Sequence, residues 1–249
     1  MLLTADIGNT NITLGLYEDD KYINEFRLAS DRDLSGEEYE ILLKSLFKDY
    51  VIDGCVIASV VEELNIKFKR AVDNVFNIKS VFVTYDINLG VKVATDNPRE
   101  VGADRIVDLV AGYEIYGGPA LVIDYGTATT YDIVTENGVF LAGVIAPGIR
   151  TSANVLYRDA ARLPEIEILK PKTILANSTI DSMQAGLYYG VVGETKYMVQ
   201  KMKEETGFDN MKVIATGGLG NMIAQTVDEI DYYDPTLTLK GLQIIYEKQ

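Results

Sequence analysis

The chain has 249 residues, with 37 Asp and Glu against 23 Lys and Arg, a formal net charge of −14 and no histidine. This acidic balance argues against nucleic acid or an acidic membrane surface as a partner, because phosphate backbones are bound through Lys and Arg. Without histidine, a Ser-His-Asp triad and a histidine-ligated metal are excluded. We therefore expect a general base to be Asp or Glu rather than Lys or Tyr, and a divalent ion to be a hard cation such as Mg²⁺.

The apolar content, 47% of the residues, is that of an ordinary globular protein. No apolar run is long enough to span a bilayer, and the N-terminus has no secretory signal, so we expect a cytoplasmic location. The single cysteine, Cys55, lies in the apolar run GCVIASVV and is expected to be a small buried side chain.

Residues 1–17 predict two strands joined by a turn at ADIGNTN. The turn places the carboxylate of Asp6 at the end of an apolar strand, where an unpaired charge would cost several kcal/mol. A metal, a backbone amide or a ligand would therefore be its partner. Taken alone, the fragment is equally consistent with a hairpin whose Asp and Asn side chains satisfy their own turn amides.

The remainder of the first half alternates strands and helices. Residues 21–30 predict a third strand, 33–50 a helix, 53–61 a buried strand, 62–76 a helix and 79–86 a strand. This order resembles a ribonuclease-H-like unit. In DNPREVGADRIVDLVAGYEIYG the apolar spacing predicts a further helix with Asp104 in its first turn, where the helix dipole favours an ionised carboxylate. Asp104 would be either an ordinary first-turn acid beside a solvated Arg105, or a proton acceptor beside a substrate-binding arginine.

The second half repeats the opening pattern. Residues Asp124-Tyr125-Gly126-Thr127-Ala128-Thr129 align without a gap with the six residues that start at Asp6, about half the chain earlier. We expect strands at 119–126, 129–134 and 139–148, a helix within 182–205, a strand ending in the glycines of TGGLG, and a helix and a terminal strand at 237–247. The repeat predicts two domains, 1–115 and 116–249.

Three glycine-bearing turns thus follow strands and could present backbone N–H groups to phosphate. None is a Walker A loop or a G-x-G-x-x-G motif. The third turn, TGGLG, occurs in many α/β proteins and would mean little by itself.

Seven stretches together resemble a known family. They are DIGNTN, NPREVGADRI, DYGTATTYDIV, IAPGI, LP, ATGGLG and DPTLTLKGL, in order from Leu3 to Leu242. The set is similar to the type III pantothenate kinases of the actin-like ATPase superfamily. The resemblance implies an α/β fold of two ribonuclease-H-like domains, each a mixed sheet flanked by helices, with a nucleotide cleft between them.

The resemblance also implies ATP-dependent phosphorylation of pantothenate to 4′-phosphopantothenate, the first step of coenzyme A biosynthesis. It implies ATP, Mg²⁺ and a monovalent cation (K⁺ or NH₄⁺) as requirements, and a homodimer. Asp104 would be the general base, Asp6 would lie near Mg²⁺, and Asp124 would bind the monovalent cation. ATP would contact Asp6, Ile7, Gly8, Asn9, Thr10, Asn11, Ile12, Thr13, Thr127, Gly217 and Gly218. Pantothenate would contact Thr95, Gly102, Ala103, Asp104, Arg105 and Thr179.

Two positions depart from the family pattern. Thr95 stands where several members have a tyrosine that contacts pantothenate, which concerns substrate affinity. Ala142-Gly143-Val144 stands where many members read G-G-A, which adds bulk beside a strand.

Two other functions are alternatives for a chain with this fold, a phosphatase and a non-catalytic regulator. An actin-like-fold phosphatase acting on a polyphosphate or nucleotide would favour a basic groove, which the charge of −14 disfavours. A non-catalytic regulator with the same fold would be expected to lack at least one of Asp6, Asp104 and Asp124, and all three are present.

Overall fold

The computed structural model describes residues 1–249 and divides them into two compact units. Unit 1 is Met1–Glu114 together with Thr236–Gln249, and unit 2 is Ile115–Pro235. The sequence-based division at 115/116 assigned residues 236–249 to the second domain, whereas in the structure they pack within unit 1.

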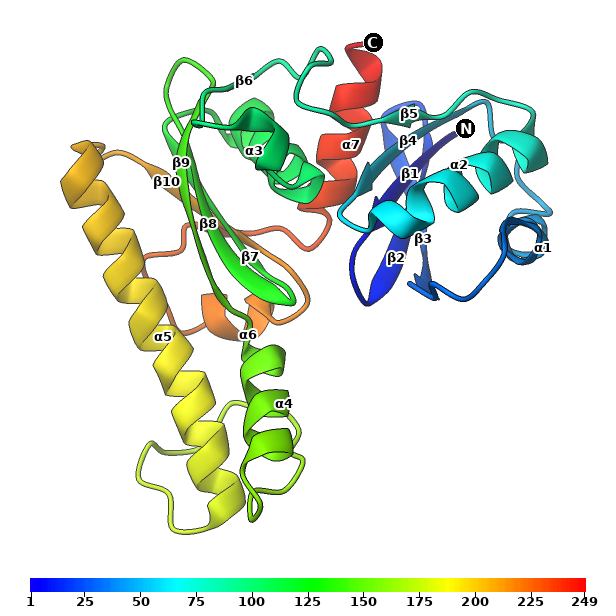
Figure 1. The fold of residues 1–249 in the computed structure, drawn as a ribbon. Coiled ribbons are helices and arrows are strands. Elements are labelled where there is room, and N and C mark those ends of the chain that lie inside the picture. The colour runs from blue at the N-terminus through cyan, green and yellow to red at the C-terminus, as the bar shows by residue number, and fades with distance from the viewer. The chain divides into compact units, whose positions relative to one another are not determined.

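Unit 1 contains a five-stranded sheet in the order β3-β2-β1-β4-β5 (Figure 1). The helices and strands that lie mainly in this unit are β1 (Leu2–Ile7), β2 (Asn11–Glu18), β3 (Lys21–Ala29), α1 (Gly36–Leu46), β4 (Gly54–Ser59), α2 (Glu62–Phe76), β5 (Val81–Phe82), β6 (Lys92–Val93), the 3₁₀ turn η1 (Pro98–Glu100), α3 (Ala103–Tyr116) and α7 (Leu237–Glu247). The two central strands, β1 and β4, are parallel, and β2 runs antiparallel to β1. The strand predicted over 79–86 is only two residues long.

Both faces of the central strands are buried. On β4, Cys55 and Ile57 pack into a core with α1 and α2, whereas Val56 and Ala58 pack into a second core with α3 and α7. This alternation explains why the strand is apolar along its whole length, since a strand covered on both faces has no polar side. Polar groups are consequently concentrated where the strands end.

The C-terminal segment is a correction to the sequence analysis, because residues 237–247 form helix α7 and not a terminal strand. Leu237, Leu239 and Ile245 alternate like a strand, but Leu242 is buried as well, which gives a broad helical stripe. A Cβ at Gly241 would overlap the carbonyl oxygen of Val107, so this glycine permits close packing of α7 on α3. Short apolar runs do not separate the two states by periodicity alone.

Unit 2 contains strands in the order β11-β10-β7-β8-β9. Its helices and strands are β7 (Ala120–Tyr125), β8 (Ala128–Val134), β9 (Val139–Pro147), α4 (Ile149–Asp159), α5 (Thr179–Thr206), β10 (Lys212–Thr216), α6 (Gly220–Ala224) and β11 (Tyr232–Tyr233). Helices α4 and α5 run side by side and extend beyond the sheet (Figure 1). The sequence analysis did not predict α4 or β11. The expected helix within 182–205 is confirmed and is longer than expected.

The predicted fold class is confirmed: the chain has two mixed sheets flanked by helices, of the actin-like ATPase type. None of the helices combines the length and the apolar character that crossing a bilayer requires.

Candidate active site

The first glycine turn is a tight hairpin between β1 and β2. Asp6 pairs with Thr13 and Ile7 with Ile12, and the amide of Gly8 donates to the carbonyl of Asn11 at 3.0 Å. The side chains of Ile7 and Ile12 are fully buried in the core, so these residues can offer a ligand only their backbone. The exposed tip of the turn consists of Asn9, Thr10 and Asn11.

The end of β4 lies beside this turn. The amide of Val60 donates to the carbonyl of Ile7 at 3.1 Å, directly after the last paired residues of β1 and β4. Parallel strands end at the same edge of a sheet, which in α/β folds is the edge where ligands bind. Asp6 is therefore positioned at the ligand edge of the first sheet.

The first turn of α3 packs on the same edge. A Cβ added at Gly102 would lie 3.4 Å from Cγ1 of Val60 and 2.5 Å from Oδ1 of Asp104. Asp104 itself accepts a hydrogen bond from the amide of Arg105 at 2.8 Å. The structure thus connects Asp104 to the end of β1 through Gly102 and Val60, although these residues are far apart in sequence.

The electrostatic setting of Asp104 is unusual for an aspartate. Burial raises the pKa of its carboxyl group above the ordinary value, and the hydrogen bond from the Arg105 amide and the Arg105 charge oppose this only in part. A carboxylate with a raised pKa is a stronger base than an exposed one, which is the property required of a proton acceptor near neutral pH.

Thr95 lies in unit 1, just after β6. Its Oγ1 atom is buried and makes no hydrogen bond with the protein. A buried hydroxyl without a partner costs about 1–3 kcal/mol, so such a group often has a water or ligand partner.

In unit 2, two glycines lie against the carboxylate of Asp124. A Cβ at Gly126 would lie 3.0 Å from its Oδ2, and a Cβ at Gly217, which has a φ of +87°, would overlap its Oδ1. Gly148 lies equally close to the carbonyl groups of Gly126 and Thr127. The second and third glycine turns of the sequence are therefore packed against one another around Asp124.

The turn at Thr127 is held from α4. The carbonyl of Thr127 accepts hydrogen bonds from the Gly148 amide at 3.2 Å and from Oγ1 of Thr151 at 2.6 Å. The side chain of Thr127 is exposed, whereas Gly218 has open space around it. Both remain accessible to a ligand.

Thr179 lies elsewhere in unit 2, at the start of α5 behind its N-cap Ser178. It lines an open groove of about 740 Å³ between α4 and α5, together with Leu156, Met183 and Leu187. Within unit 2, this groove is separate in sequence and lining from the turns around Asp124.

The chemistry of these groups suits a hard cation bound largely by its ligand. No three or more Asp, Glu, His or Cys side chains form a metal-binding group. Mg²⁺ is commonly held by one or two carboxylates together with substrate phosphates, so a single carboxylate such as Asp6 fits that pattern.

Sequence reasoning missed several residues that shape these turns, among them Val60 and Thr151. Ser30 was missed as well, and its Oγ donates to the carbonyl of Gly8 at 2.5 Å. No local motif marks these residues, because each acts through a segment that is distant in sequence.

Comparisons with known proteins identify the family and the fold. Residues 2–201 match the family described as type III pantothenate kinase. Two full-length relatives carry the same name: one from Agathobacter rectalis is 49% identical over all of this chain and 98% of its own, and one from Halalkalibacterium halodurans is 44% identical over all of this chain and 99% of its own. The structure of the ethanolamine utilization protein EutJ from Carboxydothermus hydrogenoformans superposes with a TM-score of 0.57 at 13% identity, covering 98% of this chain and 89% of that one, which is a likeness of fold.

The raised pKa of Asp104 has a consequence for stability. In the unfolded chain the carboxyl ionises near its ordinary value of about 3.9, whereas in the folded protein it ionises at a higher pH, so stability falls as pH rises through that interval. Asp104→Asn removes the free-energy cost of burying an ionised carboxylate. We therefore expect the Tm of this variant to exceed that of the parent chain at pH 7.5, and we expect the difference in Tm to become smaller as the pH is lowered towards 4.

Thermal melts followed by circular dichroism measure this difference. Asp49→Asn is the matched control, since Asp49 is exposed and the charge change is the same. A Tm of Asp104→Asn equal to or below that of the parent chain at pH 7.5 would contradict the burial of an ionised carboxylate.

Proposed function

The chain belongs to the type III pantothenate kinase family, and on that premise we propose how its residues carry the reaction. The protein phosphorylates pantothenate in coenzyme A biosynthesis, with ATP and a divalent metal as the family requires. This membership sets aside the phosphatase and the non-catalytic regulator. The roles of individual residues, the monovalent cation, the homodimer and the cytoplasmic location stay proposals.

The main proposal is that Asp104 is the general base. It is supported by one observation above the others: the carboxylate, with its raised pKa, lies close to Gly102, which also adjoins Val60 at the ligand edge of the first sheet. Asp104 accepts the proton of the pantothenate hydroxyl as that oxygen forms its bond to the γ-phosphorus. The bond from the γ-phosphorus to the bridging oxygen breaks, and ADP leaves with that oxygen. Such proton transfer contributes typically about 10²- to 10⁴-fold in rate.

The two glycine turns are assigned to the nucleotide. In unit 1, the backbone of Ile7, Gly8 and Ile12, with the exposed side chains of Asn9, Thr10 and Asn11 and the neighbouring Thr13, forms the proposed phosphate-binding turn. Asp6 would hold Mg²⁺, which when bound neutralises charge on the phosphate oxygens. In unit 2, Thr127, Gly217 and Gly218 are proposed to contact ATP on the family resemblance, and the open surfaces of Thr127 and Gly218 support this.

Within unit 1, we assign pantothenate to the residues around Asp104 and to Thr95. Gly102, Ala103 and Arg105 flank the proposed base, and a guanidinium can bind a carboxylate bidentately. The unpartnered hydroxyl of Thr95 supports a role for it as a pantothenate contact in place of the tyrosine found in other members. Thr179 is proposed on the family resemblance, and its exposed position is compatible with that role.

We expect Asp104→Asn to lower kcat by at least about a hundredfold with little change in the KM for pantothenate, because the lost interaction is made in the transition state. Steady-state assays of ADP release with and without pantothenate measure both constants. Asp49→Asn is again the control and should turn over normally. A kcat near that of the parent chain would remove Asp104 from the mechanism.

The carboxylate of Asp124 is proposed to bind K⁺ or NH₄⁺. This role is supported by the space that Gly217 leaves beside the carboxylate, because a Cβ at this position would overlap Oδ1 of Asp124. We expect Asp124→Ala to reduce the ratio of the rate in K⁺ to the rate in Na⁺, with choline chloride keeping the ionic strength constant. An unchanged ratio would refute the role.

The homodimer is proposed to use the α4–α5 region. Leu156, Ile174, Leu175 and Ile180 are exposed apolar side chains around the groove, with Leu175 at 83% exposure. Burying such side chains contributes about 1.5–3 kcal/mol each. Sedimentation equilibrium should give a dimer for the parent chain and a monomer for Leu156→Asp, whereas Ile66→Asp on α2 should not change the mass. A monomeric parent chain, or a dimer that Leu156→Asp leaves intact, would refute the proposal.

A further inference from the structure

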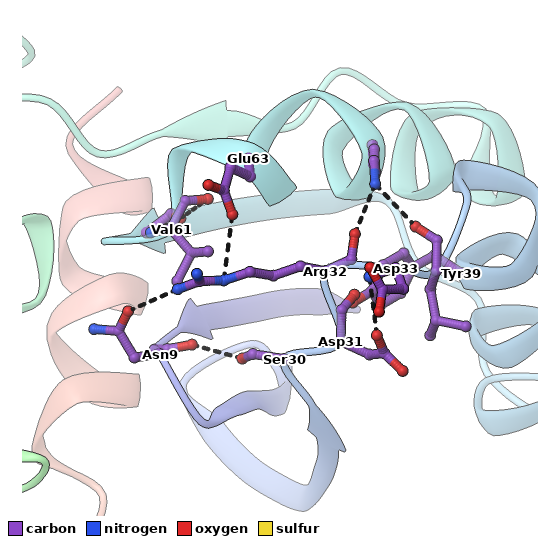
Figure 2. A network of polar contacts seen from close by, with 12 residues as sticks. Asn9, Ser30, Asp31, Arg32, Asp33, Tyr39, Val61 and Glu63 are labelled. Atoms are coloured by element: carbon purple, nitrogen blue, oxygen red, sulfur yellow. Dashed lines mark hydrogen bonds and ion pairs between the residues drawn. The ribbon is translucent and has the colours of Figure 1, made fainter.

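Arg32, in the loop between β3 and α1, reaches the proposed phosphate-binding turn from a segment that no motif marks. Its Nη2 donates to Oδ1 of Asn9 at 3.3 Å, and its Nε lies 3.3 Å from Oε2 of Glu63 at the start of α2. Figure 2 shows the guanidinium lying between these two partners. Neither contact uses Nη1.

The backbone that carries Arg32 is anchored on both sides. Towards the turn, the amide of Ser30 donates to the carbonyl of Thr10 at 3.0 Å, and Oγ of Ser30 donates to the carbonyl of Gly8 at 2.5 Å. The loop is therefore attached to the turn itself, at Gly8 just before the tip and at Thr10 within it.

On the helix side, Nζ of Lys67 donates to the carbonyls of Arg32 at 2.9 Å and Leu34 at 3.2 Å, and the hydroxyl of Tyr39 donates to the carbonyl of Asp31 at 2.8 Å. Helix α1 then begins with a capping box between Ser35 and Glu38. A loop fixed in this way loses little conformational entropy when its side chain binds a ligand.

The ion pair between Arg32 and Glu63 is weak, so Arg32 can exchange this partner for a ligand. The side chains of Arg32 and Glu63 are 52% and 67% exposed, and an exposed ion pair contributes little to stability because water screens it. A hydrogen bond to a charged group is stronger than one between neutral groups. A guanidinium can also bind a phosphate through two parallel N–H···O bonds. A phosphate at the turn would thus compete successfully with Glu63.

The contact with Asn9 serves the same ligand. Because Oδ1 of Asn9 accepts from Arg32, the amide nitrogen of Asn9 is left to act as a donor. Together, Arg32 and Asn9 then present N–H groups at the exposed tip of a turn whose base carries the carboxylate of Asp6. A polyanion beside Asp6 requires such cationic compensation, and the chain has few cations overall, 23 Lys and Arg against 37 acids.

We propose that Arg32 is a phosphate-binding residue of the nucleotide site, which contacts the terminal phosphates of ATP and exchanges Glu63 for them. This inference rests on the proposed role of the Asp6–Thr13 turn. It adds a positive side chain to a turn for which the sequence analysis named only backbone amides, small polar side chains and one carboxylate.

The test compares binding of MgATP, MgADP and AMP by isothermal titration calorimetry. We expect Arg32→Ala to raise the Kd of MgATP at least about tenfold and to leave the Kd of AMP unchanged, since AMP lacks the terminal phosphates. Arg32→Lys should recover part of the loss, because it keeps the charge without the planar fork. Each variant is first checked for a parent-like circular dichroism spectrum.

Two matched controls separate charge from structure. Lys44→Ala, on α1, removes the same unit charge from an exposed ion pair with Glu40 and should not change any Kd. Glu63→Gln releases Arg32 from its ion pair and should leave MgATP binding unchanged or tighter. If the Arg32–Glu63 pair were merely structural, Glu63→Gln and Arg32→Ala would lower Tm alike and neither would alter the Kd of MgATP.

The outcomes distinguish the inference from the function on which it rests. If the parent chain binds MgATP and turns over pantothenate, but Arg32→Ala binds MgATP normally, the proposal for Arg32 is wrong and the kinase stands. An equal loss of AMP and MgATP binding would also overturn it, since the terminal phosphates would not be the contact. If the parent chain binds no MgATP, the assignment of the turn fails first.

Discussion

The burial of β1 and β4 on both faces of the first sheet is the constraint on which the rest of unit 1 depends. Neither strand has a solvent-facing side, so apart from the buried and hydrogen-bonded Thr4 the polar side chains lie where the strands end. Asp6 lies at one such end, and Val60 at the other joins it to the first turn of α3. The glycine at position 102 keeps that junction close. The position of the proposed base thus follows from how the sheet is packed, together with the local helix signal.

The two turns that begin at Asp6 and Asp124 have the same Asp-x-Gly sequence pattern but differ in geometry. Between β1 and β2, four residues separate the last pair, Ile7 with Ile12, whereas between β7 and β8 three residues separate Tyr125 from Thr129. The first turn projects an exposed tip, which an anchored loop and Arg32 approach. In the second turn, Gly217 lies against the half-buried carboxylate of Asp124, and Gly148 lies against the carbonyls of Gly126 and Thr127. The two turns therefore expose different groups, a polar tip in the first and glycine backbone beside a carboxylate in the second.

An acidic chain can bind anionic substrates because binding depends on the groups close to the ligand and not on the net charge of the chain. Charges separated by more than a Debye length of about 8–10 Å are largely screened, so the net charge of −14 has little influence inside a site. In the proposed site, the groups assigned to the anionic substrates are those at short range: the backbone amides of the glycine turns, the first turn of α3 and nearby guanidinium groups. Lys67 has a different role, since its ammonium group donates hydrogen bonds to the carbonyls of Arg32 and Leu34 and so holds the loop that carries Arg32.

The sequence by itself determined the fold class, most of the helices and strands, the three glycine turns and the placement of Asp104 in the first turn of a helix. These features depend on local periodicity, on glycine and on helix-start chemistry, which a single stretch of chain carries. The tertiary structure alone decided that residues 237–247 form a helix within unit 1, that Val60 connects Asp104 to β1, and that Ser30 and Arg32 meet the first turn. Each of these depends on the packing or register of segments far apart in the chain, and a short apolar alternation such as that of Leu237, Leu239 and Gly241 fits a strand and a buried helix equally well until its neighbours are known.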